Sequence, residues 1–442
     1  MKKVLSTAAA LGFCLYLPVA AMAGAPAPTS GNDAVARELQ DLRSQLASQQ
    51  AEIDMLKGQK AAGPVDLSAE HKRLDALEKE NWVHAAKKKV DVTLYGQVNK
   101  AVLWADDGND DDFFFVDNAI SGTRLGVTAK SKLNDEFSVG GQLEFEWTPN
   151  NSSGVYMGMD DTAGSDAKHR QMRVWGESKS AGTLTLGHGS VATDGIAQID
   201  LSGTSIAGRT DAADGAAFKF YDKANQGYTG GVTVGSVIKD LDGGRKDGLR
   251  YDSPAFFGVT LSGGVAENNY NDLAVRYKGA FGETKVEAGL GYSIEGSENT
   301  DLNDANNVKV HSTLAGSASV MLPFGLNFTF AAGEQDFNGN LNLDDASFWY
   351  GKVGYQMKAL SVGSTSFAVD YGQYDDMRGT SALGGGTQYD ATLWGAEMVQ
   401  KFDAINTDFY VAYRLYELDE NRINVTDYDN VTVIWSGARL SF

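Results

Sequence analysis

Apolar and polar residues alternate along most of the chain from Val90 onward. Residues 137–147 show this clearly, because apolar residues such as Phe137 and Trp147 stand at odd positions and polar ones such as Glu144 at even positions. A β-strand points successive side chains to opposite faces, so each such segment has one apolar and one polar face. The segments are too short for spanning helices but have the length of tilted membrane strands, about 9–11 residues.

Sixteen segments carry this alternation, and the connections between them are alternately short and long. Short connections such as 282–283 alternate with long acidic or Asn/Gly-rich ones such as 373–386. This alternation of short and long connections predicts an all-β fold: a sixteen-stranded antiparallel transmembrane β-barrel with tight periplasmic turns and long outer loops. The predicted strands are 90–105, 121–130, 136–147, 168–177, 182–189, 246–252, 255–265, 273–281, 284–293, 307–321, 324–333, 346–357, 364–372, 387–400, 406–417 and 431–442.

The last segment ends in a free aromatic residue, Phe442, after Ile434 and Leu440 on the same face. This is the pattern expected of a membrane-facing strand that seals a barrel. A soluble β-sandwich or propeller is the alternative, but it would not need aromatic residues that all point the same way. With 51 glycines, 18 tyrosines and only seven prolines, the composition favours strands and turns over helices.

The N-terminus has the features of an export signal. Lys2 and Lys3 precede an apolar run over residues 4–20, and Ala21-Met22-Ala23 forms a small-x-small cleavage site. We expect residues 1–23 to be a signal peptide. The single cysteine, Cys14, lies inside it, so the mature chain would have no thiol for disulfides, metal binding or catalysis. Together with the barrel, this predicts the outer membrane of a Gram-negative bacterium.

The charge excludes one class of partner. Cleavage removes two lysines and no acidic residue, so the formal net charge of −20 becomes −22. Such a chain repels polyanions, which disfavours nucleic-acid binding. The mean hydropathy of −0.28 is compatible with a membrane barrel, since only one face of each strand meets lipid.

Residues 24–57 have a different period. Apolar residues repeat at heptad spacing with charged and polar residues between them, which predicts a periplasmic coiled coil of about three heptads, roughly 30 Å long. A linker with a short second helix follows over 58–89, before the barrel at 90–442. A single amphipathic helix lying on the barrel is the alternative. The coiled-coil seam that would join three copies consists of Val35, Leu39, Leu42, Leu46, Gln49, Ile53 and Leu56.

A long connection of residues 189–245 separates two predicted strands and is the third outer loop. Its first half, residues 191–215, is acidic and has Arg209 as its only cation. A loop of this length over a sixteen-stranded lumen could fold inward and narrow it. The acidic residues expected to line the constriction are Asp194, Asp200, Asp211 and Asp214.

Alternation also predicts which cations face the loop. Leu125 and Val127 face lipid, which places Arg124 toward the lumen, and the same reasoning applies along five further strands. A charge on the lipid face at mid-bilayer would cost about 2–4 kcal/mol, so the inward assignment is favoured. The basic wall so predicted consists of Arg124, Arg173, Arg250, Arg276, Arg414 and Arg439. A transverse field between this wall and the acidic loop would favour polar solutes.

Several stretches resemble the Gram-negative general (trimeric) porins. They are Val92-Thr-Leu-Tyr-Gly-Gln-Val98, Thr123-Arg-Leu-Gly-Val127, Arg173-Val-Trp-Gly176 with Gly182-Thr-Leu-Thr-Leu-Gly187, Leu249-Arg-Tyr-Asp-Ser-Pro254 and the terminal Phe442. The resemblance covers residues 90–442 and implies a sixteen-stranded homotrimer whose third loop folds into the pore. Where that family often has a basic residue after the Leu-Gly that opens the loop, this chain has His188. The stalk is similar to that of the DcaP-like subgroup, some of whose members favour small organic anions.

The sequence therefore predicts a water-filled channel for passive diffusion of small hydrophilic solutes and ions. A channel selective for small organic anions, and a tether that binds peptidoglycan through the coiled coil, remain alternatives. Charge selectivity stays open, because acidic loops favour cations at the mouth and inward arginines favour anions at the throat. The expected surroundings are outer-membrane lipids and lipopolysaccharide.

Neither catalysis nor a resident cofactor is expected. None of the five histidines stands beside a nucleophile pattern, and no phosphate-cradling glycine loop is present. Acidic outer segments such as 106–112 and 427–430 could hold surface Ca²⁺ or bridge to lipopolysaccharide through it. Solvated surface charge is the alternative that we favour.

Overall fold

The computed structural model describes Ala47 and residues 90–159, 167–228, 232–296, 309–338, 344–378, 388–420 and 427–442. The predictions for the signal peptide, the coiled-coil seam and the 58–89 linker lie outside these residues, and so stay predictions. No helix within the described ranges has the length and apolar character needed to cross a membrane.

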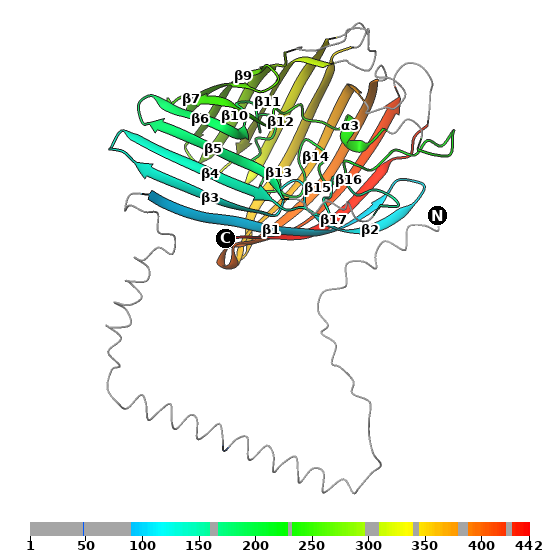
Figure 1. Cartoon of the computed structure of the whole chain (residues 1–442). Coiled ribbons are helices and arrows are strands. Elements are labelled where there is room, and N and C mark those ends of the chain that lie inside the picture. The colour runs from blue at the N-terminus through cyan, green and yellow to red at the C-terminus, as the bar shows by residue number, and fades with distance from the viewer. Residues whose placement is uncertain are drawn as a thin grey trace. The chain divides into compact units, whose positions relative to one another are not determined.

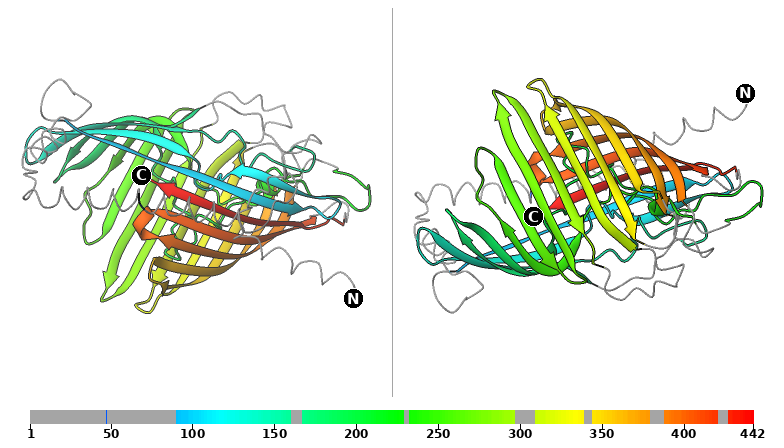
Figure 2. Two further views of the ribbon diagram at one scale, coloured as in Figure 1. Left: turned by 90° about the horizontal axis from the view of Figure 1, so that it is seen from below. Right: turned by 90° about the horizontal axis from the view of Figure 1, so that it is seen from above.

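Seventeen strands form a single sheet over the described residues, and neighbouring strands in this sheet pair antiparallel (Figure 1). The sheet closes because β1 also pairs with β17, from Gln97 opposite Ser441 to Asp106 opposite Thr432 (Figure 2). The strands are β1 (Val90–Asp106), β2 (Asp111–Asp117), β3 (Arg124–Lys132), β4 (Phe137–Glu146), β5 (Lys168–Ser178), β6 (Gly182–Ser190), β7 (Arg245–Asp252), β8 (Val259–Ala266), β9 (Tyr270–Phe281), β10 (Thr284–Ile294), β11 (Lys309–Met321), β12 (Leu326–Asn338), β13 (Ala346–Leu360), β14 (Gly363–Arg378), β15 (Gln388–Phe402), β16 (Thr407–Glu420) and β17 (Val431–Ser441).

These strands fill sixteen positions around the barrel, which confirms the predicted number. β2 and β3 share one position, because β2 pairs with the second half of β1 and β3 with its first half. β2 is a correction to the sequence prediction, which assigned residues 106–120 to a loop. Its run Phe113-Phe114-Phe115 hides the alternation, since both faces are aromatic: Phe113 and Phe115 are exposed, whereas Phe114 is buried.

The C-terminal residue completes the closure. The backbone N–H of Gly96 in β1 donates to the carbonyl oxygen of Phe442 at 2.9 Å, and the N–H of Phe442 donates back to Gly96 at 3.0 Å. A Cβ on residue 96 would lie 2.7 Å from the Phe442 ring, so glycine leaves the space that the ring occupies. The Phe442 side chain remains exposed on the outside, as predicted for a strand facing the membrane.

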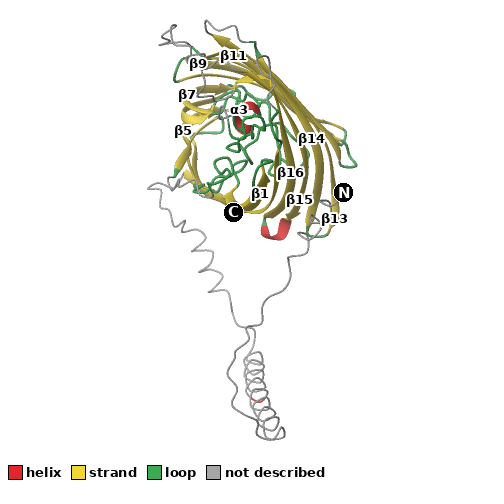
Figure 3. Cartoon of the chain, turned by 90° about the vertical axis from the view of Figure 1, so that its right-hand side faces the viewer, coloured by secondary structure: helices red, strands yellow, loops and turns green. Residues whose placement is uncertain are grey.

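The third outer loop lies inside the barrel (Figure 3). It contains the short helix α3 (Val234–Val237), and its apolar residues Ile206, Phe218 and Phe220 are buried against the wall. The wall contributes inward residues of the long strands, including Tyr374 and Trp435, to the same hydrophobic cluster. This side of the lumen is therefore packed like the core of a soluble protein, and a cavity remains beside β5, β6, β7 and β9.

Candidate functional site

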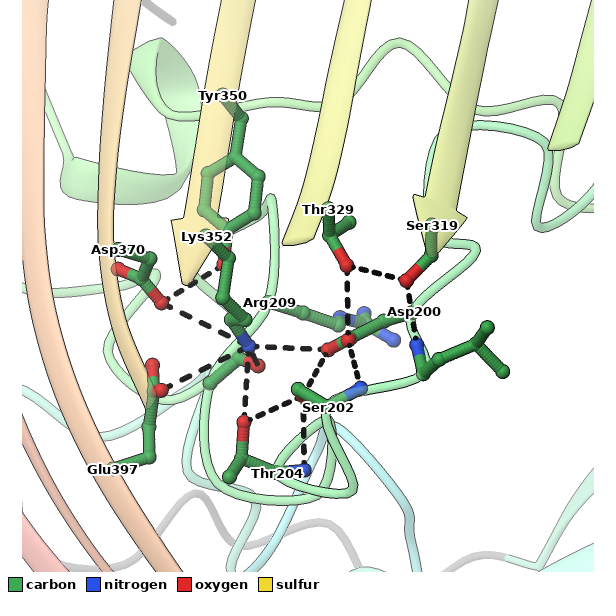
Figure 4. A network of polar contacts seen from close by, with 12 residues as sticks. Asp200, Ser202, Thr204, Arg209, Ser319, Thr329, Tyr350, Lys352, Asp370 and Glu397 are labelled. Carbon is green, nitrogen blue, oxygen red and sulfur yellow. Dashed lines mark hydrogen bonds and ion pairs between the residues drawn. The ribbon is translucent and has the colours of Figure 1, made fainter. Parts of the chain in front are cut away.

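Lys352 of β13 binds the third outer loop to the barrel wall from inside the lumen (Figure 4). Its Nζ donates to the carbonyl oxygen of Gly208 at 2.8 Å and to Asp200 Oδ2 at 3.2 Å. The carboxylates of Asp370 in β14 and Glu397 in β15 lie 3.9 and 3.8 Å from the same nitrogen. The Lys352 side chain has no exposed surface, so this ion-pair network is shielded from water.

Arg414 of β16 makes a second attachment beside the first. Its Nη1 donates to Asp370 Oδ2 at 2.8 Å and to Glu397 Oε1 at 2.9 Å, while Nη2 donates to the carbonyl oxygen of Arg209 at 2.7 Å. Asp214 accepts a hydrogen bond of 2.7 Å from the Tyr416 hydroxyl and lies 4.0 Å from Arg414 Nε. We call this buried group of side chains the loop anchor; it consists of Asp200, Asp214, Lys352, Asp370, Glu397, Arg414 and Tyr416.

On the side of the lumen that the loop fills, three of the four predicted acidic loop residues are paired with cations. Asp200 and Asp214 belong to the loop anchor, and Asp211 accepts hydrogen bonds from Arg209 at 2.5 Å. Burial acts to raise the pKa of Asp200, but the Lys352 ammonium and the hydrogen bonds from Ser202 together outweigh it and leave this pKa below its ordinary value. Burial raises the pKa of Asp214 despite the opposing charge of Arg414. These carboxylates hold the loop to the wall.

On the open side, a cavity of about 490 Å³ lies between the third outer loop and the strands β5, β6, β7 and β9. Asp194 is the loop carboxylate that borders it, and three of the predicted arginines border it from the wall. The lining residues are Arg173, Trp175, Thr183, Thr185, Ser190, Asp194, Arg250, Asp252 and Arg276. Arginines, carboxylates and hydroxyls thus meet in one water-accessible space.

The three arginines differ in how far their N–H groups are already used. Arg250 donates to Asp252 at 2.7 Å and to the carbonyl oxygen of Val191 at 2.8 Å, so it braces the start of the loop. Arg173 donates through Nε to Gln142 at 2.9 Å, and Arg276 donates through Nη2 to the carbonyl oxygen of Asp194 at 2.8 Å. Within the described residues, Arg276 Nη1 is buried and has no hydrogen-bond partner. Arg173 is therefore the cation whose terminal N–H groups remain available to a solute.

The remaining predicted arginines lie elsewhere. Arg124 Nη2 contacts Gln97 at 3.3 Å, and Arg439 is paired with Asp408 of the neighbouring strand. Both guanidinium groups also approach Ser121 Oγ, at 3.5 and 3.4 Å. Arg414 lies in the loop anchor. The six positions of the predicted basic wall thus divide into the cavity, the Ser121 region and the anchor.

Sequence reasoning missed Arg170. A β-bulge in β5 shifts the register between Glu144 and Phe145, so His169 and Gln171 pair with adjacent residues and Arg170 is left over. Arg170 turns to the polar face, where it pairs with Glu144 at 2.8 Å and with Glu146. No sequence signal marks a bulge of this kind, because it is one extra residue in an otherwise regular strand.

His188 pairs with Asp247 of β7, with 3.1 Å between Nδ1 and Oδ2. It follows the exposed Leu184 and Leu186 at the same alternation, on the outer face of the barrel. No group of three or more histidine, cysteine, aspartate or glutamate residues in the described ranges has an arrangement that could hold a metal ion. Surface Ca²⁺ therefore stays a prediction.

Comparisons with known proteins agree with this architecture. A family model described as Gram-negative porin matches residues 82–421. An anion-selective porin from Comamonas acidovorans is 17% identical with a TM-score of 0.56, covering 80% of this chain and 100% of that one. In-vitro folded OmpT, an outer membrane protein of Vibrio cholerae, is 16% identical with a TM-score of 0.50, covering 81% and 100%.

The outer membrane channel DcaP of Acinetobacter baumannii is 15% identical with a TM-score of 0.48, covering 80% of this chain and 98% of that one. A comparison with curated proteins finds no match. At identities this low, the solved structures show a shared fold.

Proposed function

The chain belongs to the Gram-negative porins and forms an outer-membrane channel for passive diffusion of small solutes, and we propose that this channel prefers anions. The observation that carries the preference is the unequal neutralisation of charge around the lumen. Asp200, Asp211 and Asp214 are paired on the filled side, whereas Arg173 and Arg276 line the cavity on the open side and Arg173 donates only through Nε among the described residues. Solutes that cross the cavity would therefore meet excess positive potential.

The reversal potential under a KCl gradient in a planar bilayer tests this preference. Wild-type protein should favour chloride, and the double variant Arg173→Gln with Arg276→Gln should shift the reversal potential toward that of K⁺. Lys223→Gln is the control, since Lys223 pairs with Asp427 and Asp429 on the outer loops. A wild-type preference for K⁺, or a double variant with unchanged reversal potential, would contradict the proposal.

We also propose a homotrimer, and the short strands on one side of the barrel support association between copies. β7 and β8 have eight residues each, which at about 3.4 Å per residue and a tilt near 40° span roughly 20 Å. A transmembrane barrel normally shows an apolar band about 25 Å tall, so this side is better covered by a second copy than by lipid. Leu249, Leu261 and Val265 give it an exposed apolar outer face. Light scattering of the detergent-purified protein should give three chains, and a monomeric mass would contradict this assembly.

The finer predictions remain part of the same proposal. Three stalks would form the coiled coil in the periplasm, as in the DcaP-like subgroup, with contact to peptidoglycan as an accessory role. The family and fold are those of a channel, and we propose no catalytic step. The outer face would contact membrane lipids and lipopolysaccharide.

A further inference from the structure

The cavity that carries the proposed anion preference also contains an indole. Trp175 lies on β5 two residues beyond Arg173, so both side chains point to the same face and their Cα atoms are about 7 Å apart along the strand. Trp175 is opposite Thr185 of β6, which is opposite Arg250 of β7, so the three form one row across the wall. The indole therefore stands directly beside the arginines of the cavity.

A glycine on the neighbouring strand allows the indole to lie against the wall. Gly140 of β4 pairs with Trp175, and a Cβ at position 140 would lie 2.3 Å from Cζ2 and 2.5 Å from Cε2 of the indole. The ring thus covers the bare backbone of Gly140, and Trp175 is only half-buried while it lines the cavity. This placement leaves indole surface available to a solute.

The neighbouring charges favour an anion beside this ring. Asp252 accepts hydrogen bonds from Arg250 and from the Ser262 hydroxyl, at 2.7 and 2.6 Å, so its charge is compensated. Asp194 lies 3.9 Å from Arg245. Arg173 is oriented by its Nε contact with Gln142, which leaves its terminal N–H groups for a ligand. A guanidinium fork beside an aromatic face matches a carboxylate carried on a planar ring.

We propose that this cavity is a binding subsite for aromatic carboxylates, in which Arg173 holds the carboxylate and Trp175 stacks on the ring. The inference rests on the proposed anion preference and adds a class of solute to it. Thr183 and Thr185 offer hydroxyls at the same level for ring substituents. An aliphatic carboxylate of the same charge would keep the ion pair but lose the stacking contact.

Benzoate and cyclohexanecarboxylate are the probes, because they share a charge and nearly a size but differ in planarity. Each would be titrated against the KCl current of full-length protein in a planar bilayer. Benzoate should halve the current at a concentration about fivefold lower than cyclohexanecarboxylate, as expected for one aromatic stacking contact. Trp175→Leu should bring this ratio close to one, and Trp175→Phe should keep part of it.

Trp394→Leu is the matched control, since Trp394 is 51% exposed on the outer face and should keep the ratio. Gly140→Ala gives an independent loss, because its methyl group would displace the indole while Trp175 itself is kept. A wild-type ratio near one, or a ratio unchanged in both Trp175→Leu and Gly140→Ala, overturns the aromatic subsite. The chloride preference of the wild-type reversal potential reports separately on the proposed function, so the two can fail independently.

Discussion

At the scale of single residues, the same type of side chain has opposite roles on the two sides of the lumen. Arg414 and Lys352 have no exposed surface and hold the loop, whereas Arg173 borders open space. Alternation predicts Arg414 and Arg173 as inward-facing, but it cannot distinguish their roles. The difference depends on where the loop packs, and that is decided by long-range contacts such as Lys352 with Gly208.

Lys352→Met should therefore loosen the loop. The change removes the cation that compensates Asp200 and one of the two that compensate Asp370 and Glu397, and breaking one partner of a buried ion-pair network typically costs about 3–5 kcal/mol. We expect a larger and noisier open-channel conductance, because the loop would leave the wall for part of the time. Single-channel recording measures this directly.

Lys223→Met is the matched control for that variant. It removes an ion pair with Asp427 that is exposed to solvent, where screening makes such pairs weak. Its conductance should equal that of wild-type protein. If Lys352→Met also behaved as wild type, the loop would be held mainly by its apolar packing.

At the scale of elements, the sequence predicts strands well because membrane strands must separate lipid-facing from water-facing residues. The prediction failed where that separation is interrupted. β2 has aromatic residues on both faces, and β5 gains one residue at the bulge that contains Arg170. The internal course of the third loop could be expected from its length, but its contacts could not, since they follow no local period.

The loop also carries a carboxyl group that should make selectivity depend on pH. Burial, followed by the charges of Asp240 and Asp194, raises the pKa of Asp242 to about 7. Its carboxylate accepts the backbone N–H of Gly195 at 2.6 Å, next to Asp194 at the cavity. Below pH 7 the group is neutral and above it is negative, so the preference for chloride should weaken between about pH 6 and 8.

Reversal potentials recorded at a series of pH values measure this change. Asp242→Asn should remove most of the dependence, because the amide keeps the size and an acceptor oxygen but cannot ionise. A pH profile that is the same in wild-type protein and in Asp242→Asn would assign the titration to another group.

At the scale of the whole molecule, closure of the barrel depends on one seam, where the first strand β1 pairs with the last strand β17. Gly96 takes part in this seam through its backbone and through the space it leaves for Phe442. A Cβ at position 96 would lie 2.7 Å from both the Arg124 carbonyl oxygen and the Phe442 ring. Because the carbonyl is backbone, Gly96→Ala should separate the seam and destabilise the barrel by about 1–3 kcal/mol.

Gly351→Ala separates this effect from the general cost of changing a strand glycine. Gly351 lies in β13, and a Cβ there would meet no atom within 4 Å. Glycine weakens a strand interior by about 0.5–1 kcal/mol relative to alanine, so Gly351→Ala should be neutral or slightly stabilising. Urea unfolding in detergent, followed by tryptophan fluorescence, compares the two variants. Equal midpoints would mean that the seam tolerates the methyl group and that closure relies on the β1–β17 ladder rather than on the fit of Phe442.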